Sequence, residues 1–121
     1  KSWTQLMDYL RLTIGHNQND VFHILFLNIK LEIIADERQQ QGTINHTPIY
    51  PREVVKRALE LGASSIILVH NHPSGTIDAS KEDVAVTKNI INMARPLGIS
   101  VHDHVIVSER EYFSFKAKGL I

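Results

Sequence analysis

The sequence contains no cysteine, and its 13 basic and 13 acidic residues cancel to a formal net charge of zero. Without cysteine, the chain has no disulfide bond and no thiolate for catalysis or for a cysteine-rich zinc site. Any metal ligands must therefore be histidine or carboxylate side chains. The lack of cysteine also fits a cytoplasmic protein. A neutral chain gives no electrostatic reason to expect DNA binding, which usually involves a basic patch.

Long hydrophobic runs are also missing from the sequence. No apolar stretch has the length needed to span a membrane, so we expect no membrane partner. The chain does have 121 residues, of which 43% are hydrophobic, and this is enough to bury a core. We therefore expect a single domain over residues 1–121.

The most informative stretch is an apolar run that ends in two histidines. Residues 64–69, which include the aliphatic run Ile66-Ile67-Leu68-Val69, predict a buried strand, and His70 and His72 lie at its end. Because side chains alternate along a strand, both imidazoles are expected on one face, with Asn71 on the other. Pro73 has no N–H to donate to a sheet ladder, so it should end the strand.

A helix that begins at Ser80 is predicted to bring a carboxylate to the same point. Ser80 fits the N-cap position, and Asp83 lies three residues later, over the same face of the first turn. The strand and the helix converge across a loop of roughly eight residues, and loops of this kind often carry functional residues. Two imidazoles and one carboxylate form a three-ligand zinc set with a fourth position for water. We therefore hypothesise a catalytic zinc (Zn²⁺) held by His70, His72 and Asp83, which would activate water and polarise a carbonyl.

Each of these residues also has a purely structural interpretation. Ser80 and Asp83 form a capping pattern, with an acidic side chain near the positive end of the helix dipole. A single histidine is more often a hydrogen-bonded structural residue than a ligand. The conjunction of two histidines, a serine and an aspartate at these offsets has no shared structural reason, and it favours the metal site.

A second histidine pair, His102 and His104, lies on a strand predicted over residues 99–107. Alternation places Val101 and Asp103 on one face of this strand and both histidines on the other. No acidic residue follows this pair at a comparable spacing, so a rival metal site here is less favoured. Asp103 and His104 can instead orient the metal ligands through hydrogen bonds without binding the metal themselves.

Hydrophobic periodicity predicts an α/β domain with a mixed sheet, helices on its faces and an N-terminal hairpin. His23 and His46 are interpreted as structural residues. In the longest helix, Val86, Ile90, Met93 and Leu97 form the predicted core stripe, with Asp83 on the same side. The predicted helices cover residues 3–12, 51–61 and 80–95, and the predicted strands cover residues 20–28, 31–36, 64–69, 99–107 and 112–115, with a short extended piece at 42–44.

The pattern His70-x-His72, seven residues, Ser80, two residues, Asp83 matches the motif of the JAMM (MPN+) zinc metalloproteases in full. The match implies the JAMM/MPN fold, which is an α-β-α layered domain with a curved mixed sheet, similar to the cytidine deaminase-like folds. It also implies hydrolysis of a peptide or isopeptide bond, with a protein or peptide as the substrate.

The longer string His-Asn-His-Pro-Ser-Gly, which starts at His70, resembles the RadC branch of that group. Pro51-Arg52-Glu53 upstream and Asp103-His104 downstream extend the resemblance to about residues 20–121. RadC proteins usually carry an N-terminal helix-hairpin-helix region as well. We therefore expect this chain to be the catalytic-type domain alone.

The resemblance also implies roles for the residues around the metal ligands. Ser80 would donate a hydrogen bond to the developing oxyanion, and this role is compatible with its role as N-cap. In the family, a glutamate near the start of the first strand accepts a proton from water, and Asp20 stands at the matching place here. Asp20 is one methylene shorter than glutamate, and Glu53 is a second candidate for the base.

Two other function classes remain open at this point. The first is a weakly active or inactive metal-binding module of a DNA-repair-associated protein, motivated by Asp20 and by the historical naming of the RadC family. The second is a metal-dependent nuclease, for which two histidines and one carboxylate are a poor ligand set, since paired magnesium ions prefer oxygen ligands.

Overall fold

The computed structural model describes residues 2–15, 21–39, 49–72 and 77–121. Asp20, His46 and the extended piece predicted at 42–44 lie outside the described residues. The helices are α1 (Trp3–Thr13), α2 (Pro51–Leu61) and α3 (Lys81–Ala94), followed by a 3₁₀ turn η1 (Arg95–Leu97). The strands are β1 (Phe22–Leu27), β2 (Ile33–Arg38), β3 (Ser65–His70), β4 (Ser100–Val107) and β5 (Tyr112–Ser114).

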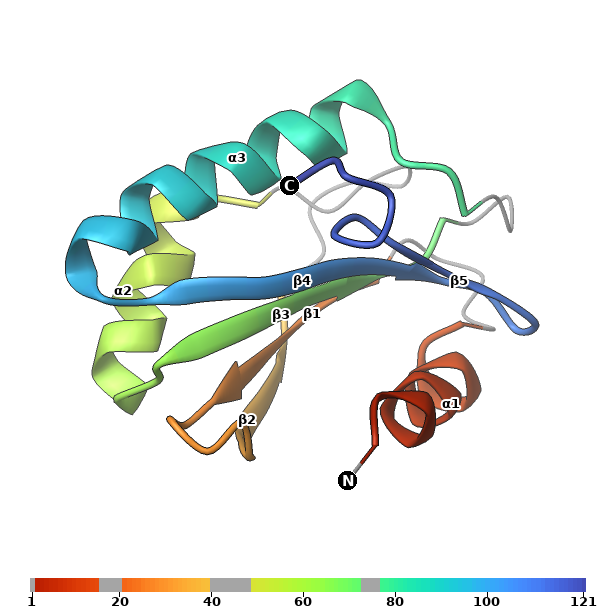
Figure 1. The fold of residues 1–121 in the computed structure, drawn as a ribbon, viewed down its shortest axis with the longest axis horizontal. Helices are drawn as coiled ribbons and strands as arrows, with labels where there is room; N and C mark the ends of the chain where they lie inside the picture. Colours follow the sequence, from red (N-terminus) through yellow and green to blue (C-terminus); the bar gives the residue numbers. More distant parts are fainter. Residues whose placement is uncertain (1, 16–20, 40–48, 73–76) are drawn as a thin grey trace.

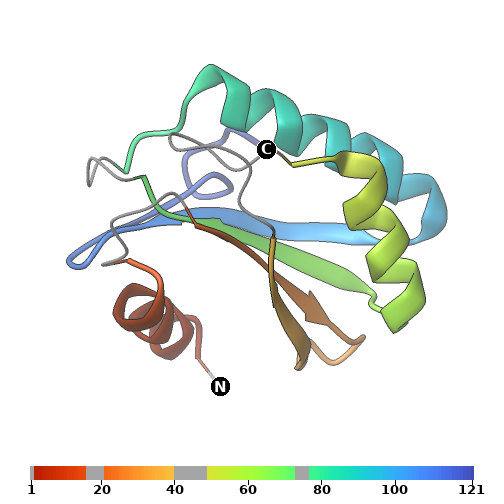
Figure 2. The same ribbon diagram turned by 180° about the vertical axis from the view of Figure 1, so that it is seen from behind.

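The strands form one open, mixed sheet in the order β2-β1-β3-β4-β5. β3 and β4 are parallel, and the other neighbours are antiparallel. Helices α2 and α3 cover one face of the sheet, and α1 lies against the other (Figure 1), as the reverse view also shows (Figure 2). The predicted α-β-α layered fold is therefore confirmed. None of the helices in the described ranges is long and apolar enough to cross a membrane.

The central strand β3 is buried on both faces. Leu68 packs with Phe26 and Ile90 in the cluster between the sheet and helices α2 and α3. Its neighbour Val69 packs with Leu10 in the cluster between the sheet and α1. Because neighbouring side chains point to opposite faces, a strand that is covered on both sides consists of consecutive aliphatic residues. This explains the uninterrupted apolar run that leads to the histidines.

The buried side of α3 differs from the predicted core stripe. Met93 and Leu97 are 41% and 50% exposed, whereas Thr87 and Ala94 are fully buried together with Ile90. Thr87 can be buried because its hydroxyl group forms hydrogen bonds inside the protein, and the buried row of α3 then consists of positions 87, 90 and 94. The prediction followed the apolar residues alone, so it was wrong for Met93 and Leu97.

β4 does not alternate as the sequence predicted. The pairing of β3 with β4 shifts register between Ile66 and Ile67, so that one additional residue is accommodated in β4. As a result, Val101 packs in the cluster under α2 and α3, whereas His102 lies next to Trp3 of α1, with a ring-centroid separation of 6.0 Å. His102 and His104 therefore do not form a pair on one face, and the prediction that they would was wrong.

Asp103 connects the C-terminal segment to β4 through hydrogen bonds. This carboxylate is only 3% exposed and accepts hydrogen bonds from the backbone N–H groups of His104 (2.7 Å) and Lys116 (3.1 Å) and from the hydroxyl of Ser114 (2.5 Å). Replacing Asp103 by alanine would leave three donors without this acceptor, and we expect a loss of about 3 kcal/mol in the free energy of unfolding. Equilibrium unfolding in urea measures this loss.

Asp8→Ala is the matched control for this substitution. Asp8 is exposed and forms an ion pair with Arg11 on the surface of α1, so its replacement should cost less than about 1 kcal/mol. Equal losses in the two variants would contradict the structural role assigned to Asp103.

Candidate metal centre

The C-terminal end of β3 and the N-terminal end of α3 lie at the same edge of the sheet (Figure 1). His70 is the last residue of β3, and His72 follows two residues later. Asp83 is the third residue of α3. The sheet and the helix thus fix the backbones that carry the three predicted ligands.

The side chains of these three residues converge closely. His70 Nε2 lies 2.9 Å from His72 Nε2 and 3.5 Å from Asp83 Oδ1, and His72 Nε2 lies 3.2 Å from Asp83 Oδ2. Ligands at about 2.05 Å from a tetrahedral metal ion would be about 3.3 Å apart. The three separations bracket this value, and the ligand atoms all lie within 4.8 Å of one another. His70, His72 and Asp83 can therefore hold a metal ion.

Ser80 and Asp83 form a reciprocal capping box at the start of α3. The Ser80 hydroxyl accepts a hydrogen bond from the Asp83 N–H (3.0 Å), and Asp83 Oδ2 accepts one from the Ser80 N–H (3.1 Å). The cap orients the Asp83 carboxylate towards the histidines. In this bond the hydroxyl oxygen of Ser80 is the acceptor, so its hydrogen can still be donated to a substrate. The structural and the functional interpretation are thus compatible.

The surroundings of Asp83 favour its ionised form. Burial alone would raise the pKa of Asp83, but the side-chain contacts with His70 and His72 and the hydrogen bond from the backbone N–H of Ser80 outweigh it. The net effect holds the pKa of Asp83 well below its usual range. A carboxylate that stays ionised near neutral pH is ready to bind a cation.

A further histidine supports His70 from inside the protein. His104 is fully buried, and its Nε2 lies 2.9 Å from His70 Nδ1. Its other ring nitrogen, Nδ1, lies 2.6 Å from the hydroxyl oxygen of Thr87. Phe115 stacks on His104, and Phe22 stacks on His70. Burial lowers the pKa of His104 well below its usual value, and the proximity of His70 lowers it further, although the Asp83 carboxylate acts in the opposite direction.

Other residues singled out in the sequence lie apart from this group. Glu53 is exposed in the first turn of α2 and lines a separate cavity with Asn89 and Met93. His23 forms a pair with Asp36 of β2 at 2.8 Å, consistent with a structural role. His102 faces α1, as described above. Among the described histidine, aspartate and glutamate residues, only His70, His72 and Asp83 form such a group.

Thr87 was not among the candidate residues predicted from the sequence. Its position four residues after Asp83 places it on the same side of α3, one turn further along, and this spacing could have revealed it. Its burial could not be inferred, because threonine is usually a surface residue in a helix of this kind.

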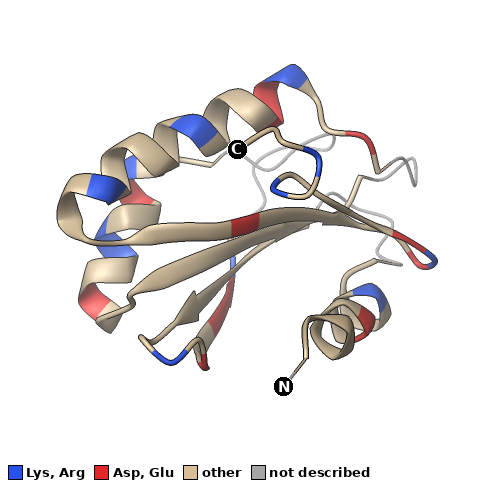
Figure 3. Cartoon of the chain, viewed as in Figure 1, with Lys and Arg blue, Asp and Glu red and all other residues tan. Residues whose placement is uncertain are grey.

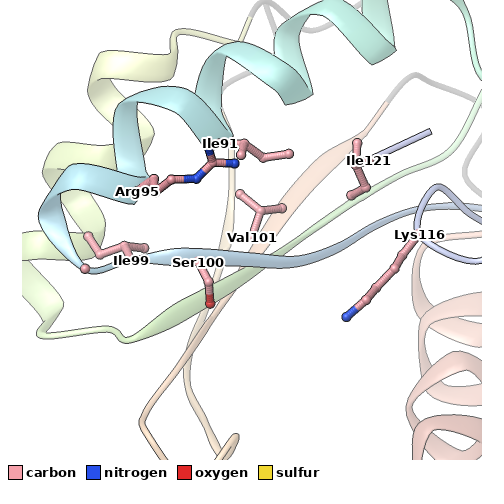
Figure 4. A pocket seen from close by; sticks show the side chains of 8 residues that line it. Ile91, Arg95, Ile99, Ser100, Val101, Lys116 and Ile121 are labelled. Atoms are coloured by element: carbon pink, nitrogen blue, oxygen red, sulfur yellow. The ribbon is translucent and has the colours of Figure 1, made fainter. Parts of the chain in front are cut away.

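A cavity of about 350 Å³ lies at the far end of α3, between that helix, the start of β4 and the C-terminal residues (Figure 4). Arg95 and Lys116 line it together with aliphatic side chains. It shares no residue with the group formed by His70, His72 and Asp83. Both α2 and α3 carry basic and acidic residues along their length (Figure 3).

Comparison with known proteins supports the assignment made from the motif. The family model described as "RadC-like JAB domain" matches residues 1–120. A UPF0758 protein from Rhodobacter capsulatus is 49% identical over 120 residues, which is 99% of this chain and 56% of that protein. The chain thus spans about half the length of this relative. From its motif and from the match along nearly its whole length, the chain belongs to the family of RadC-like JAB domains.

Proposed function

We propose that this domain is a zinc-dependent hydrolase of peptide or isopeptide bonds. The observation that carries the proposal is the convergence of two imidazole nitrogens and one carboxylate at separations that suit a tetrahedral ion. Nitrogen ligands favour zinc over magnesium or calcium, which prefer oxygen. Three protein ligands leave the fourth position open, as in catalytic zinc sites. When bound there, zinc supplies a Lewis acid that activates water and polarises a carbonyl.

The residues of the chain would divide the remaining work. His70, His72 and Asp83 hold the ion, and the capping box keeps the Asp83 carboxylate turned towards the histidines. Ser80 lies within that box, close to the ligand group, where its hydroxyl hydrogen can be donated to the oxyanion that develops on the substrate carbonyl. The substrate would be a protein or a peptide.

The general base is assigned from the family pattern. We propose Asp20, which precedes β1, as the carboxylate that accepts the proton from water. β1 is the neighbour of β3 in the sheet, and Phe22 is paired with His70, so the N-terminal end of β1 adjoins the ligands. Glu53, on α2, lines a separate cavity and is the weaker candidate.

A DNA-associated binding module is a second function that the family name suggests. The mixed charges on α2 and α3 give no support for it (Figure 3). We also propose a cytoplasmic location, because a chain without cysteine needs no oxidising compartment to form disulfide bonds.

The test of the proposal compares metal-free and zinc-loaded protein on mixtures of peptides and isopeptides, with cleavage detected by mass spectrometry. We expect cleavage only with zinc, reversed by a chelator and restored by added zinc. If the protein binds one equivalent of zinc and cleaves neither kind of bond, the hydrolase proposal fails and the binding module takes its place.

A further inference from the structure

We propose that Thr87 and His104 are positioning residues that fix the tautomer of His70, so that its Nε2 lone pair faces the metal. The inference rests on the metal site of the proposed function, but not on hydrolysis. It follows from three short contacts that join α3, β4 and β3 in a chain of hydrogen bonds.

The chain starts at a group that can only accept. The Thr87 hydroxyl lies 2.6 Å from the backbone carbonyl oxygen of Asp83, one turn earlier in α3. A carbonyl oxygen has no hydrogen, so the single hydroxyl hydrogen of Thr87 must point to it. His104 Nδ1 also lies 2.6 Å from the Thr87 hydroxyl. Because that hydrogen is already used, His104 Nδ1 must be the donor and must carry a hydrogen.

The second step concerns the contact between the two buried imidazoles. His70 Nδ1 and His104 Nε2 are 2.9 Å apart, so one of them donates to the other. His104 has no exposed surface and lies against the rings of Phe115 and Phe22, an environment that favours a neutral imidazole with a single N–H. Since that N–H is at Nδ1, the His104 Nε2 atom has a lone pair and accepts a hydrogen bond from His70.

The third step concerns the His70 atom that would bind the metal. A neutral His70 that donates from Nδ1 has its lone pair on Nε2, the atom that lies 2.9 Å from His72 Nε2 and 3.5 Å from Asp83 Oδ1. The orientation of the whole chain is therefore set by the Asp83 backbone carbonyl, which belongs to the same residue as the third ligand. Helix α3 thus provides the Asp83 side chain as one ligand, and its backbone carbonyl at Asp83 fixes the tautomer of a second ligand, His70.

Thr87→Val tests this inference directly, with Thr87→Ser as the matched control. Valine has the shape of threonine without the hydroxyl, so His104 loses the acceptor for Nδ1–H and can place its hydrogen on Nε2, against His70. Serine keeps the hydroxyl. We expect zinc affinity, measured by competition with a chromophoric chelator, to fall about 10- to 100-fold in the valine variant and to stay near wild type in the serine variant.

Imidazole ¹⁵N NMR of the metal-free protein provides a measurement that does not depend on zinc or on hydrolysis. In the wild type, both His70 and His104 should carry their hydrogen on Nδ1, and the His104 tautomer should change in the Thr87→Val variant. A wild-type His104 with its hydrogen on Nε2 would overturn the inference. Unchanged tautomers and unchanged zinc affinity in a folded Thr87→Val protein would overturn it as well.

A second pair of variants tests the inference if the Thr87→Val protein does not fold. His104→Gln keeps a carbonyl acceptor that can face His70, whereas His104→Phe has none. Zinc should bind more tightly to the glutamine variant than to the phenylalanine variant, and equal affinities would contradict the inference. Because a metalloprotein without hydrolase activity would still show these effects, failure of this inference and failure of the proposed function can be told apart.

Discussion

Replacing His72 by alanine is expected to abolish zinc retention and peptide hydrolysis together. His72 Nε2 lies 2.9 Å from His70 Nε2 and 3.2 Å from Asp83 Oδ2. Its removal leaves one imidazole and one carboxylate, which is too few for a stable zinc site. The wild type should retain about one zinc per chain after dialysis and the variant almost none. Elemental analysis of the dialysed proteins measures the zinc, and the cleavage assay measures the activity.

Two other histidines provide controls for this experiment. His102 lies beside Trp3 on the opposite face of the sheet, and His23 is paired with Asp36. Alanine at either position should leave both zinc content and cleavage close to wild type. Cleavage that survives in the His72→Ala variant would exclude the proposed mechanism. Loss of zinc in the His102→Ala variant would instead revive the rival histidine pair.

Removal of the Ser80 hydroxyl should reduce kcat by about 10²- to 10³-fold, the effect typical of losing one hydrogen-bond donor to an oxyanion. The hydroxyl is also the N-cap of α3, so a single substitution would not separate the two roles. Alanine at an N-cap costs about 1 kcal/mol of stability, whereas glycine costs only a few tenths of a kcal/mol. The Ser80→Ala and Ser80→Gly variants therefore differ in how well residue 80 caps α3, whereas both lack the hydroxyl donor.

We expect the two Ser80 variants to differ in thermal stability but to share the same large loss of kcat, with zinc content unchanged in both. Steady-state kinetics and thermal unfolding measure the two quantities. If Ser80→Gly retained wild-type kcat, Ser80 would be a cap and nothing more. If both variants lost zinc, the hydroxyl would act by orienting Asp83 and not on the substrate.

Local rules of secondary structure were sufficient to predict that the side chains of His70, His72 and Asp83 would converge. Alternation along β3, continued for two residues beyond its end, predicts His70 and His72 on one side, and the capping pattern fixes where α3 begins and hence where Asp83 points. Each of these rules acts over a few residues, so each can be applied to the sequence without knowing the rest of the fold. The structure brings these side chains together as the spacing predicted.

The supporting residues were harder to predict because they depend on long-range pairing. His104 meets His70 only because β3 and β4 are adjacent, and its side chain faces α3 only because the register shifts by one residue before it. No local pattern marks this shift, and strict alternation placed Val101 and His102 on the wrong faces. Thr87 is buried for a similar reason, since its partner His104 comes from a different element.

The positions of the proposed ligands along the chain affect the order in which the domain can assemble. His70, His72 and Asp83 lie close together in the sequence, and closing so short a loop costs little chain entropy. His104 arrives only after the chain has passed through α3 and returned to form a parallel strand, which is a slower, non-local event. We therefore expect an ion captured early to act as a local folding nucleus around which β3 and α3 dock, with His104 joining the site as the sheet is completed.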